Sequence, residues 1–266
     1  RRSEARLVIR CLGSLELAVD GVRVVPAAIR RKRVLTLLGV LLAHHDRPQC
    51  KDVLIEMLWP GADPDVRTRQ FHVLVHELRK LIEPPNRRGE RRYVCSRADR
   101  YWFETRSSCW IDMIEFRGLL DLARNAEAAH EPQAAIGAYE AAADLYRGDY
   151  MEDEPFAEWC DQTREQLRED CLGMLGRLAM LWGALGRWDR SAAWSRRALS
   201  LDPLREEMHR ALMYALWASG RRDEAVRQYE ACAHLLGERL DLAPLPETEQ
   251  LLARIRATAR PRPPSH

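Results

Sequence analysis

The chain has no apolar run that approaches the roughly 20 residues needed to cross a bilayer. Its seven cysteines are an odd number and form no CxxC pair, which fits neither a zinc ribbon nor a disulfide framework. The first residues also lack the apolar segment of a signal peptide. We therefore expect a cytoplasmic protein with reduced cysteines and no membrane partner.

The motifs of common enzyme sites are also missing. The sequence contains no glycine-rich phosphate loop, no GxSxG and no HExxH, and its eight histidines are scattered. His72 and His76 could bind a metal in principle, but no Cys, Asp or Glu nearby is placed to complete a ligand set. Glu152, Asp153 and Glu154 fit a solvated loop better than an acid–base pair. We therefore predict no enzymatic activity, no cofactor and no metal.

The charge is small overall but unevenly distributed. Residues 1–104 hold 21 basic and 13 acidic residues, a net charge of +8, whereas residues 105–266 hold 21 and 27, a net charge of −6. Most basic residues are arginines, which suits phosphate recognition and could equally reflect genomic base composition. The asymmetry suggests that only the first part of the chain faces a polyanion.

The first part begins with strand signals. Residues 7–12 and 15–19 read as two short strands, and LELAV alternates apolar and polar residues. Asp20-Gly21 is a strong hairpin signal, so residues 22–25 would return as the next strand.

Helical periodicity follows these strands. Apolar stripes predict helices over residues 34–42, 53–58 and 63–82, and a terminal hairpin is expected from residues 92–96 and 101–104. Strands, three helices and a hairpin are the order of a winged helix with an N-terminal sheet. We predict an α+β winged-helix DNA-binding domain over residues 1–104.

The segment 63–82 has two unlike faces when wound at about 100° per residue. Its apolar face consists of Phe71, Leu74, Val75, Leu78, Leu81 and Ile82. Its opposite face carries Arg69, His72, Val73, His76 and Lys80. Asp63 or Asp65 can cap the first turn, and Pro84 prevents continuation. A solvated amphipathic helix would show the same pattern, but the cationic surroundings favour a helix that meets an anion.

A helix of this kind fits the major groove of DNA. Arg69 could form a fork with guanine, Gln70 or His72 could approach bases or phosphates, and Val73 could meet a thymine methyl. Cations at the start of the first helix and at the hairpin turn could lie beside the backbone or a minor groove. Taken singly, each residue could equally be ordinary surface charge. The predicted DNA-binding set is Arg30, Arg31, Lys32, Arg33, Arg67, Arg69, Gln70, His72, Val73, His76, Lys80, Arg97 and Arg100.

Beyond Ile114 strand signals give way to Ala-rich helical pairs. Gly186-Arg187-Trp188-Asp189 recurs 34 residues later as residues 220–223, and this spacing is the tetratricopeptide period. An earlier unit around Tyr139 is separated from the others by an insert, residues 147–170. We predict a mainly α chain with an all-α, TPR-like domain over residues 110–257, the alternative being an unrelated helical bundle. Residues 258–266 are expected to form a disordered tail.

Two sets of segments carry a family resemblance. LGSLELAVDGVRV, RKRVLTLLGVLLAHHDRP and LIEMLWPGADPDVRTRQFHVLVHELRKLIEP resemble the OmpR-type winged helix of the Streptomyces antibiotic regulatory protein (SARP) family of transcriptional activators. WIDMIEFRGLLDLA, LYRGDYMEDEPFAEWCDQTREQLRE and LDPLREEMHRALMYALWASGRRDEAVRQYEACAHLLGERLDLAPLPET resemble the bacterial transcriptional activator domain (BTAD) of the same family. The resemblance covers nearly the whole chain.

The resemblance implies an activator that binds directly repeated promoter sites as side-by-side protomers, a homodimer on double-stranded DNA, and recruits RNA polymerase. It also implies a short-form member without an appended ATPase module, and a loop facing the polymerase that consists of Trp59, Pro60, Gly61 and Asp63. Residues 67–72 depart from the small-residue and Leu pattern usual in the family. One alternative is a regulator whose repeat domain senses a small-molecule or peptide ligand that controls DNA binding. Another is a scaffold whose winged helix binds protein.

Overall fold

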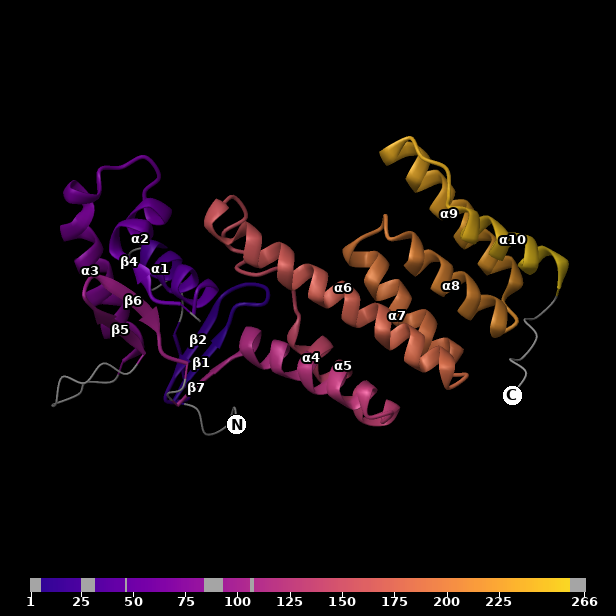
Figure 1. Cartoon of the computed structure of the whole chain (residues 1–266), viewed down its shortest axis with the longest axis horizontal. Helices are drawn as coiled ribbons and strands as arrows, with labels where there is room; N and C mark the ends of the chain where they lie inside the picture. Colours follow the sequence, from indigo (N-terminus) through magenta and orange to yellow (C-terminus); the bar gives the residue numbers. More distant parts are fainter. Residues whose placement is uncertain (1–5, 25–31, 46, 84–92, 106–107, 259–266) are drawn as a thin grey trace. The chain divides into compact units, whose positions relative to one another are not determined.

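The computed structural model describes residues 6–24, 32–45, 47–83, 93–105 and 108–258 (Figure 1). Arg30 and Arg31 of the predicted DNA-binding set, and residues 259–266 of the predicted tail, lie outside these ranges. The chain forms two compact units, residues 1–117 with 145–168 and residues 118–144 with 169–266. This division differs from the expected one, because the segment 145–168 packs with the first unit.

A four-stranded sheet opens unit 1. Its strands are β1 (Leu7–Arg10), β2 (Glu16–Val19), β3 (Val22–Val24) and β7 (Cys109–Ile111), in the order β3-β2-β1-β7. Asp20 and Gly21 have φ of 48° and 80° and join β2 to β3, as the hairpin signal predicted. The sequence analysis missed β7, which pairs parallel with β1. A strand of three residues has too little periodicity to be recognised without its partner.

The three predicted helices of unit 1 are present, as α1 (Lys32–Ala43), α2 (Lys51–Leu58) and α3 (Pro64–Ile82). The predicted hairpin is formed by β5 (Val94–Arg97) and β6 (Arg100–Phe103). A two-residue strand that was not predicted, β4 (Gln49–Cys50), pairs with β6 and gives a second sheet of order β4-β6-β5. The first strand of this sheet therefore leads directly into α2.

The segment 145–168 was assigned to the repeat part, yet it closes over α1. The Tyr150 hydroxyl donates a hydrogen bond to the carbonyl oxygen of Gly39 at 2.8 Å, and its ring is fully buried. A Cβ placed on Gly39 would lie 2.6 Å from the indole of Trp159 and 2.8 Å from the terminal methyl of Met151. Only a glycine at this point of α1 lets the segment approach so closely.

A buried carboxylate joins three parts of unit 1. Asp112, the first residue of α4 (Asp112–Ala128), is 1% exposed and accepts backbone hydrogen bonds from Cys11, Leu12 and Met113 at 2.8 to 3.1 Å. Arg147 approaches the same carboxylate to 3.7 Å. Burial raises the pKa of Asp112, and the hydrogen bonds from Cys11, Leu12 and Met113 oppose that shift.

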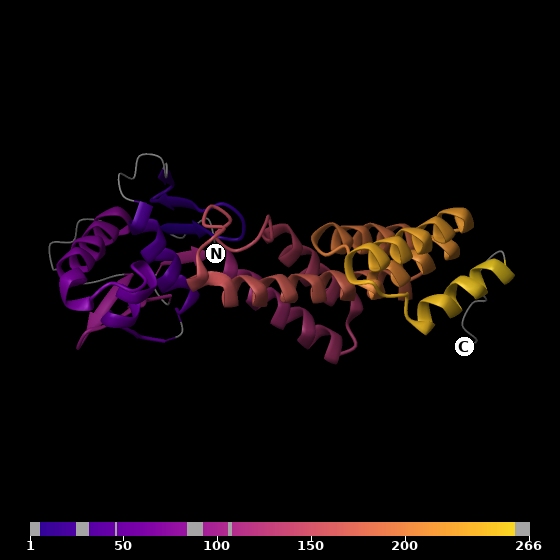
Figure 2. The same ribbon diagram turned by 90° about the horizontal axis from the view of Figure 1, so that it is seen from above.

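The residues described for unit 2 are mainly helical. They belong to the later part of α4, to α5 (Pro132–Leu145), the later part of α6 (Asp161–Ala184), α7 (Trp188–Leu201), α8 (Glu206–Ala218), α9 (Arg222–Leu240) and α10 (Pro246–Ala257). α7 lies beside α8, and α8 beside α9, in both views (Figure 1, Figure 2). Among the described helices, none combines the length and the apolar character that a bilayer crossing requires.

The repeat predicted from the sequence recurs in the turns of unit 2. His130, Gly186 and Gly220 have φ of 58°, 68° and 85°. The next residue donates its N–H to a carbonyl five residues back in each case, at 2.8 to 2.9 Å. These are matching left-handed helix ends, and His130 occupies the position that glycine holds in the two later units.

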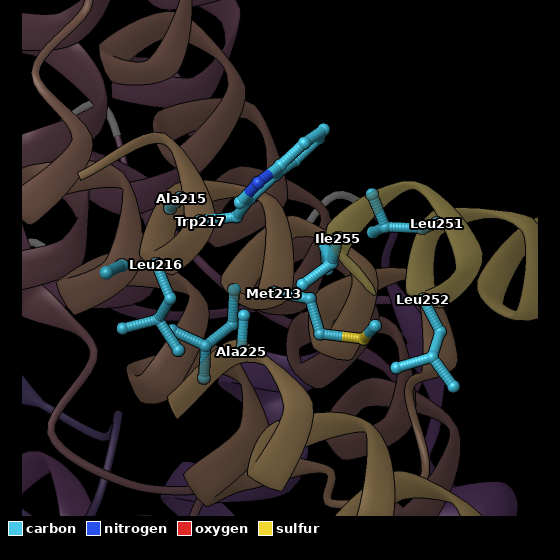
Figure 3. Packing of buried hydrophobic residues seen from close by; sticks show 10 residues of the cluster. Met213, Ala215, Leu216, Trp217, Ala225, Leu251, Leu252 and Ile255 are labelled. Carbon is cyan, nitrogen blue, oxygen red and sulfur yellow. The ribbon is translucent and has the colours of Figure 1, made fainter. Parts of the chain in front are cut away.

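One apolar cluster of unit 2 is built from side chains of α7, α8, α9 and α10. Met213 of α8 lies with Leu252 and Ile255 of α10 (Figure 3). Trp217 is buried, and its indole N–H donates to the carbonyl of Thr258 at 3.0 Å. Thr258 was placed in the expected tail, but it ends α10 and is part of this packing.

Candidate nucleic-acid interface

The start of α3 is determined by a capping residue and a proline. The Asp63 carboxylate accepts a hydrogen bond from the backbone N–H of Asp65 at 2.9 Å, and Pro64 takes the first helical position. On its inner face, Phe71 and Leu78 are fully buried, and Phe71 meets the Tyr101 ring edge-on at 5.0 Å between centroids. The predicted amphipathic helix is therefore confirmed, and its rotation about its axis is determined by this buried face.

The opposite face of α3 points outward. The exposed residues are Arg69, Gln70, His72, Val73, His76 and Lys80, with Val73 exposed by 39%. Lys80 lies 11 residues after Arg69, which corresponds to about 16 Å along the helix. The face thus presents cations, a carboxamide and one apolar side chain over about three turns.

A groove of about 750 Å³ runs between the start of α1 and this face. Its lining consists of Lys32, Arg33, Trp59, Arg67, Arg69, Gln70, Val73 and Leu74. None of these described lining side chains is acidic, and four of them are cationic, so the groove favours an anion. The structure thus brings together Lys32 and Leu74, which lie 42 positions apart in the sequence.

Trp59 organises the cations of this groove. Its indole is 8% exposed, and the guanidinium carbons of Arg33 and Arg67 lie 5.5 and 5.8 Å from its ring centre. Arg67 also donates a hydrogen bond to Gln70 at 2.7 Å. These cation–π contacts hold the guanidinium groups of Arg33 and Arg67 beside the ring and restrict the conformations of both side chains. Lys32 differs, because its amine lies 3.2 Å from the Glu154 carboxylate and is partly neutralised.

The two arginines of the hairpin flank its turn. Arg97 and Arg100 are paired across a two-residue turn in which Ala98 and Asp99 have φ of 48° and 57°. Both arginines are exposed, and Arg100 also donates to the Pro48 carbonyl at 3.4 Å. The turn places their charges at the tip of the β5–β6 hairpin.

Two residues that the sequence analysis did not select connect this hairpin to α3. Arg79 donates to the Val94 carbonyl and to the Ser96 hydroxyl, both at 3.0 Å. The Glu83 carboxylate accepts the backbone N–H groups of Tyr93 and Val94 at 3.1 and 2.9 Å. Both residues lie at the edge of the buried face of α3. A charged residue at such a position is expected to be solvent-exposed, so the sequence pattern does not reveal these contacts.

The loop between α2 and α3 has mixed exposure. Trp59 is buried beneath the arginines, whereas Pro60 and Gly61 are exposed and Asp63 caps α3. Gly61 has a φ of 71° and donates its N–H to the Glu56 carboxylate at 2.9 Å. The exposed residues of the loop are thus Pro60, Gly61 and Asp63, whereas Ala62 is half-buried.

Among the described residues, no three His, Cys, Asp or Glu side chains gather as metal ligands would. His72 and His76 instead line a shallow hollow of about 500 Å³ with Asp65, Thr68, Arg69 and Val73. This hollow continues the exposed face of α3 beyond the groove.

Comparison with known proteins adds a family and a set of relatives. Residues 111–256 match the family described as the bacterial transcriptional activator domain. The chain is 25% identical over 219 residues to the regulatory protein AfsR of Streptomyces coelicolor, which covers 82% of this chain and 21% of AfsR. It is 26% identical over 252 residues to the transcriptional regulatory protein EmbR of Mycobacterium tuberculosis, which covers 95% of this chain and 64% of EmbR.

A solved structure matches nearly the whole chain. The structure of Mycobacterium tuberculosis EmbR in complex with a low-affinity phosphopeptide matches with a TM-score of 0.79 and 25% identity, over 97% of this chain and 67% of that one. The chain therefore spans about two thirds of EmbR and about a fifth of AfsR.

Proposed function

Because the chain belongs to the SARP-type transcriptional regulators, which carry the bacterial transcriptional activator domain, we propose that it is a sequence-specific DNA-binding transcriptional activator. In this proposal residues 1–104 act as an OmpR-type winged helix, in which α3 enters the major groove and the β5–β6 hairpin is the wing. Residues 110–257 serve dimerisation, regulation or polymerase contact. The protomers bind side by side on promoter repeats and recruit RNA polymerase.

The observation that carries the proposal is the outward face of α3 beside a groove whose described lining residues include four cations and no carboxylate. A duplex is a dense array of phosphates, and cations that neutralise them supply much of the binding free energy. The major groove is about 12 Å wide and accepts one helix. A face of about 16 Å can therefore read bases at one end and reach the backbone at the other.

We assign two roles to the residues of this face. Arg69 is placed near the start of α3, where a guanidinium can form two hydrogen bonds with a guanine edge, and Val73 follows one turn later, where it can meet a thymine methyl. His76 and Lys80 lie further along and meet phosphates. Arg33 and Arg67, braced on Trp59, face the backbone beside the start of the helix.

The proposal is tested with the full chain and a site selected from randomised duplexes. Arg69→Ala should weaken binding to the selected site by about 1–3 kcal/mol and leave affinity for random duplex nearly unchanged. Lys80→Ala should weaken binding to all duplexes. It should also make the fall of log affinity with log salt less steep, by about 1 in the slope. Arg124→Ala, an exposed arginine of α4 in unit 2, is the matched control.

Three results would count against this assignment. Equal losses for Arg69→Ala on every duplex would restrict Arg69 to a phosphate contact. A loss of similar size for Arg124→Ala would mean that total charge, rather than the face of α3, governs affinity. A folded chain that binds no duplex at low salt would contradict the function itself.

A second candidate is peptide sensing by the repeat part, favoured by the phosphopeptide in the solved EmbR structure. A ligand that binds only the native chain raises its stability by RT ln(1 + [L]/Kd), about 2.7 kcal/mol at 100 times Kd. Phosphorylated and unphosphorylated versions of one peptide should therefore differ in the thermal shift they cause. The same shift with both versions, or none, would count against a phosphopeptide sensor.

A further inference from the structure

Phe156 is 95% exposed, whereas the other three phenylalanines of the chain are at most 1% exposed. Single exposed apolar residues are common on protein surfaces and do not by themselves mark a contact. An almost completely exposed aromatic ring on a hydrogen-bonded loop is a stronger indication of a contact surface. Phe156 combines this exposure with an ordered loop, an adjoining groove and a loop that is mainly acidic.

The loop that carries Phe156 is hydrogen-bonded on both sides of the ring. Glu154 donates its N–H to the Met151 carbonyl at 2.8 Å, and Ala157 donates to the Glu154 carbonyl at 3.2 Å. The guanidinium of Arg164 donates to the same Glu154 carbonyl at 2.9 Å. The loop is therefore already shaped before any partner binds, which lowers the entropy lost on association.

An apolar groove of about 800 Å³ adjoins the ring within unit 1. Phe156, Met57, Leu58, Pro60 and Trp159 supply its apolar lining. The remaining lining residues are Lys32, Arg33, Thr36, Glu56, Glu154, Ala157 and Glu158. The surface thus pairs a projecting ring with a hollow, as contact surfaces built around an aromatic anchor do.

The charge around the ring selects the kind of partner. Glu152, Asp153, Glu158 and Asp161 are exposed on the same loop or just after it. Asp161 pairs with Arg164 at 2.9 Å, which leaves the loop acidic overall. Carboxylates repel a phosphate backbone and attract a basic protein surface. Lys32 and Arg33 also line the groove, but the carboxylates outnumber them and Lys32 is paired with Glu154, so the loop favours a basic protein surface over nucleic acid.

We propose that Phe156 and its adjoining groove form a docking surface for a protein partner that receives the ring in an apolar pocket rimmed by Arg and Lys. For a transcriptional activator this partner is RNA polymerase, so the assignment of the partner rests on the proposed function. The groove shares Lys32 and Arg33 with the proposed DNA interface, whereas Phe156 belongs only to the docking surface, so the test uses substitutions that leave both cations in place.

The test measures binding of purified bacterial RNA polymerase holoenzyme to the immobilised full chain without DNA, and duplex affinity separately. Phe156→Ala should weaken polymerase binding tenfold or more, as loss of an anchor does, and change duplex affinity less than twofold. Glu158→Lys should also weaken polymerase binding, because it places a cation against a basic rim. Val22→Ala is the matched control, since it removes an apolar side chain of unit 1 that is 71% exposed.

Each outcome supports or overturns one of the two proposals. Polymerase binding that survives Phe156→Ala, or that falls equally with Val22→Ala, overturns the docking surface. A wild-type chain that does not bind the holoenzyme overturns the polymerase as partner. Light scattering that shows Phe156→Ala converting a dimer to a monomer identifies a second copy as the occupant and overturns the proposal. A wild-type chain that binds the holoenzyme but binds no duplex contradicts the proposed function and leaves the docking surface standing.

Discussion

Gly39→Ala tests how the segment 145–168 is seated on α1. The added methyl would lie 2.6 Å from the Trp159 indole and 2.8 Å from Met151, closer than carbon atoms approach without displacement. Overpacking of this kind typically costs about 1–3 kcal/mol. Alanine also favours the helix by about 0.5–1 kcal/mol relative to glycine. The net change expected is therefore a loss of about 0–2.5 kcal/mol.

A matched glycine isolates the packing contribution. Gly137 lies inside α5, where a Cβ would meet nothing within 4 Å. Gly137→Ala should stabilise its unit by about 0.5–1 kcal/mol through the helix alone. The difference between the two variants removes the shared helix contribution and should be about 1–3 kcal/mol.

Urea denaturation followed by circular dichroism and by tryptophan fluorescence measures both variants. At a slope of about 2 kcal/mol per M, a loss of about 1 kcal/mol lowers the midpoint by about 0.5 M. Trp159→Phe removes the ring atom that the methyl would strike, so it should recover part of the loss in the Gly39→Ala background. If Gly39→Ala stabilises as much as Gly137→Ala, the close approach of Trp159 to α1 is refuted.

Two further variants examine the hairpin and the repeat unit. Arg79→Ala removes two hydrogen bonds that hold β5 to α3, so it should destabilise unit 1 by about 1–3 kcal/mol in urea denaturation and weaken duplex binding; an unchanged midpoint would contradict the connection. Hydrogen bonds from Arg177 and Tyr139 lower the pKa of Glu127 in unit 2. A carboxyl group whose pKa is lowered in the folded state stabilises the protein at pH values above its ordinary pKa of about 4.3. This contribution disappears as the pH falls through the folded-state pKa. Glu127→Gln should therefore be less stable than the wild type at pH 7 and approach it below pH ~4, measured by thermal melting; a difference that does not depend on pH would refute this origin.

The sequence by itself determined the elements whose signals act over a few residues. Asp63 and Pro64 mark the start of α3, and the spacing of Phe71 and Leu78 turns its apolar face inward. Asp20-Gly21 specifies the hairpin through its left-handed backbone. The family resemblance is confirmed, and the cationic face of α3 is outward as expected. Its contact with DNA stays a prediction.

Tertiary structure alone decided the pairings between distant segments. β7 is three residues long and becomes a strand only because β1 accepts it, and Asp112 bonds to residues about 100 positions away. Trp159 packs against Gly39 only because this residue has no Cβ, and a periodic sequence pattern does not reveal such a contact. The assembly of Arg33 and Arg67 around Trp59 has the same origin. Capping and periodicity are local interactions, whereas these contacts require complementary shapes that exist only after the chain has folded.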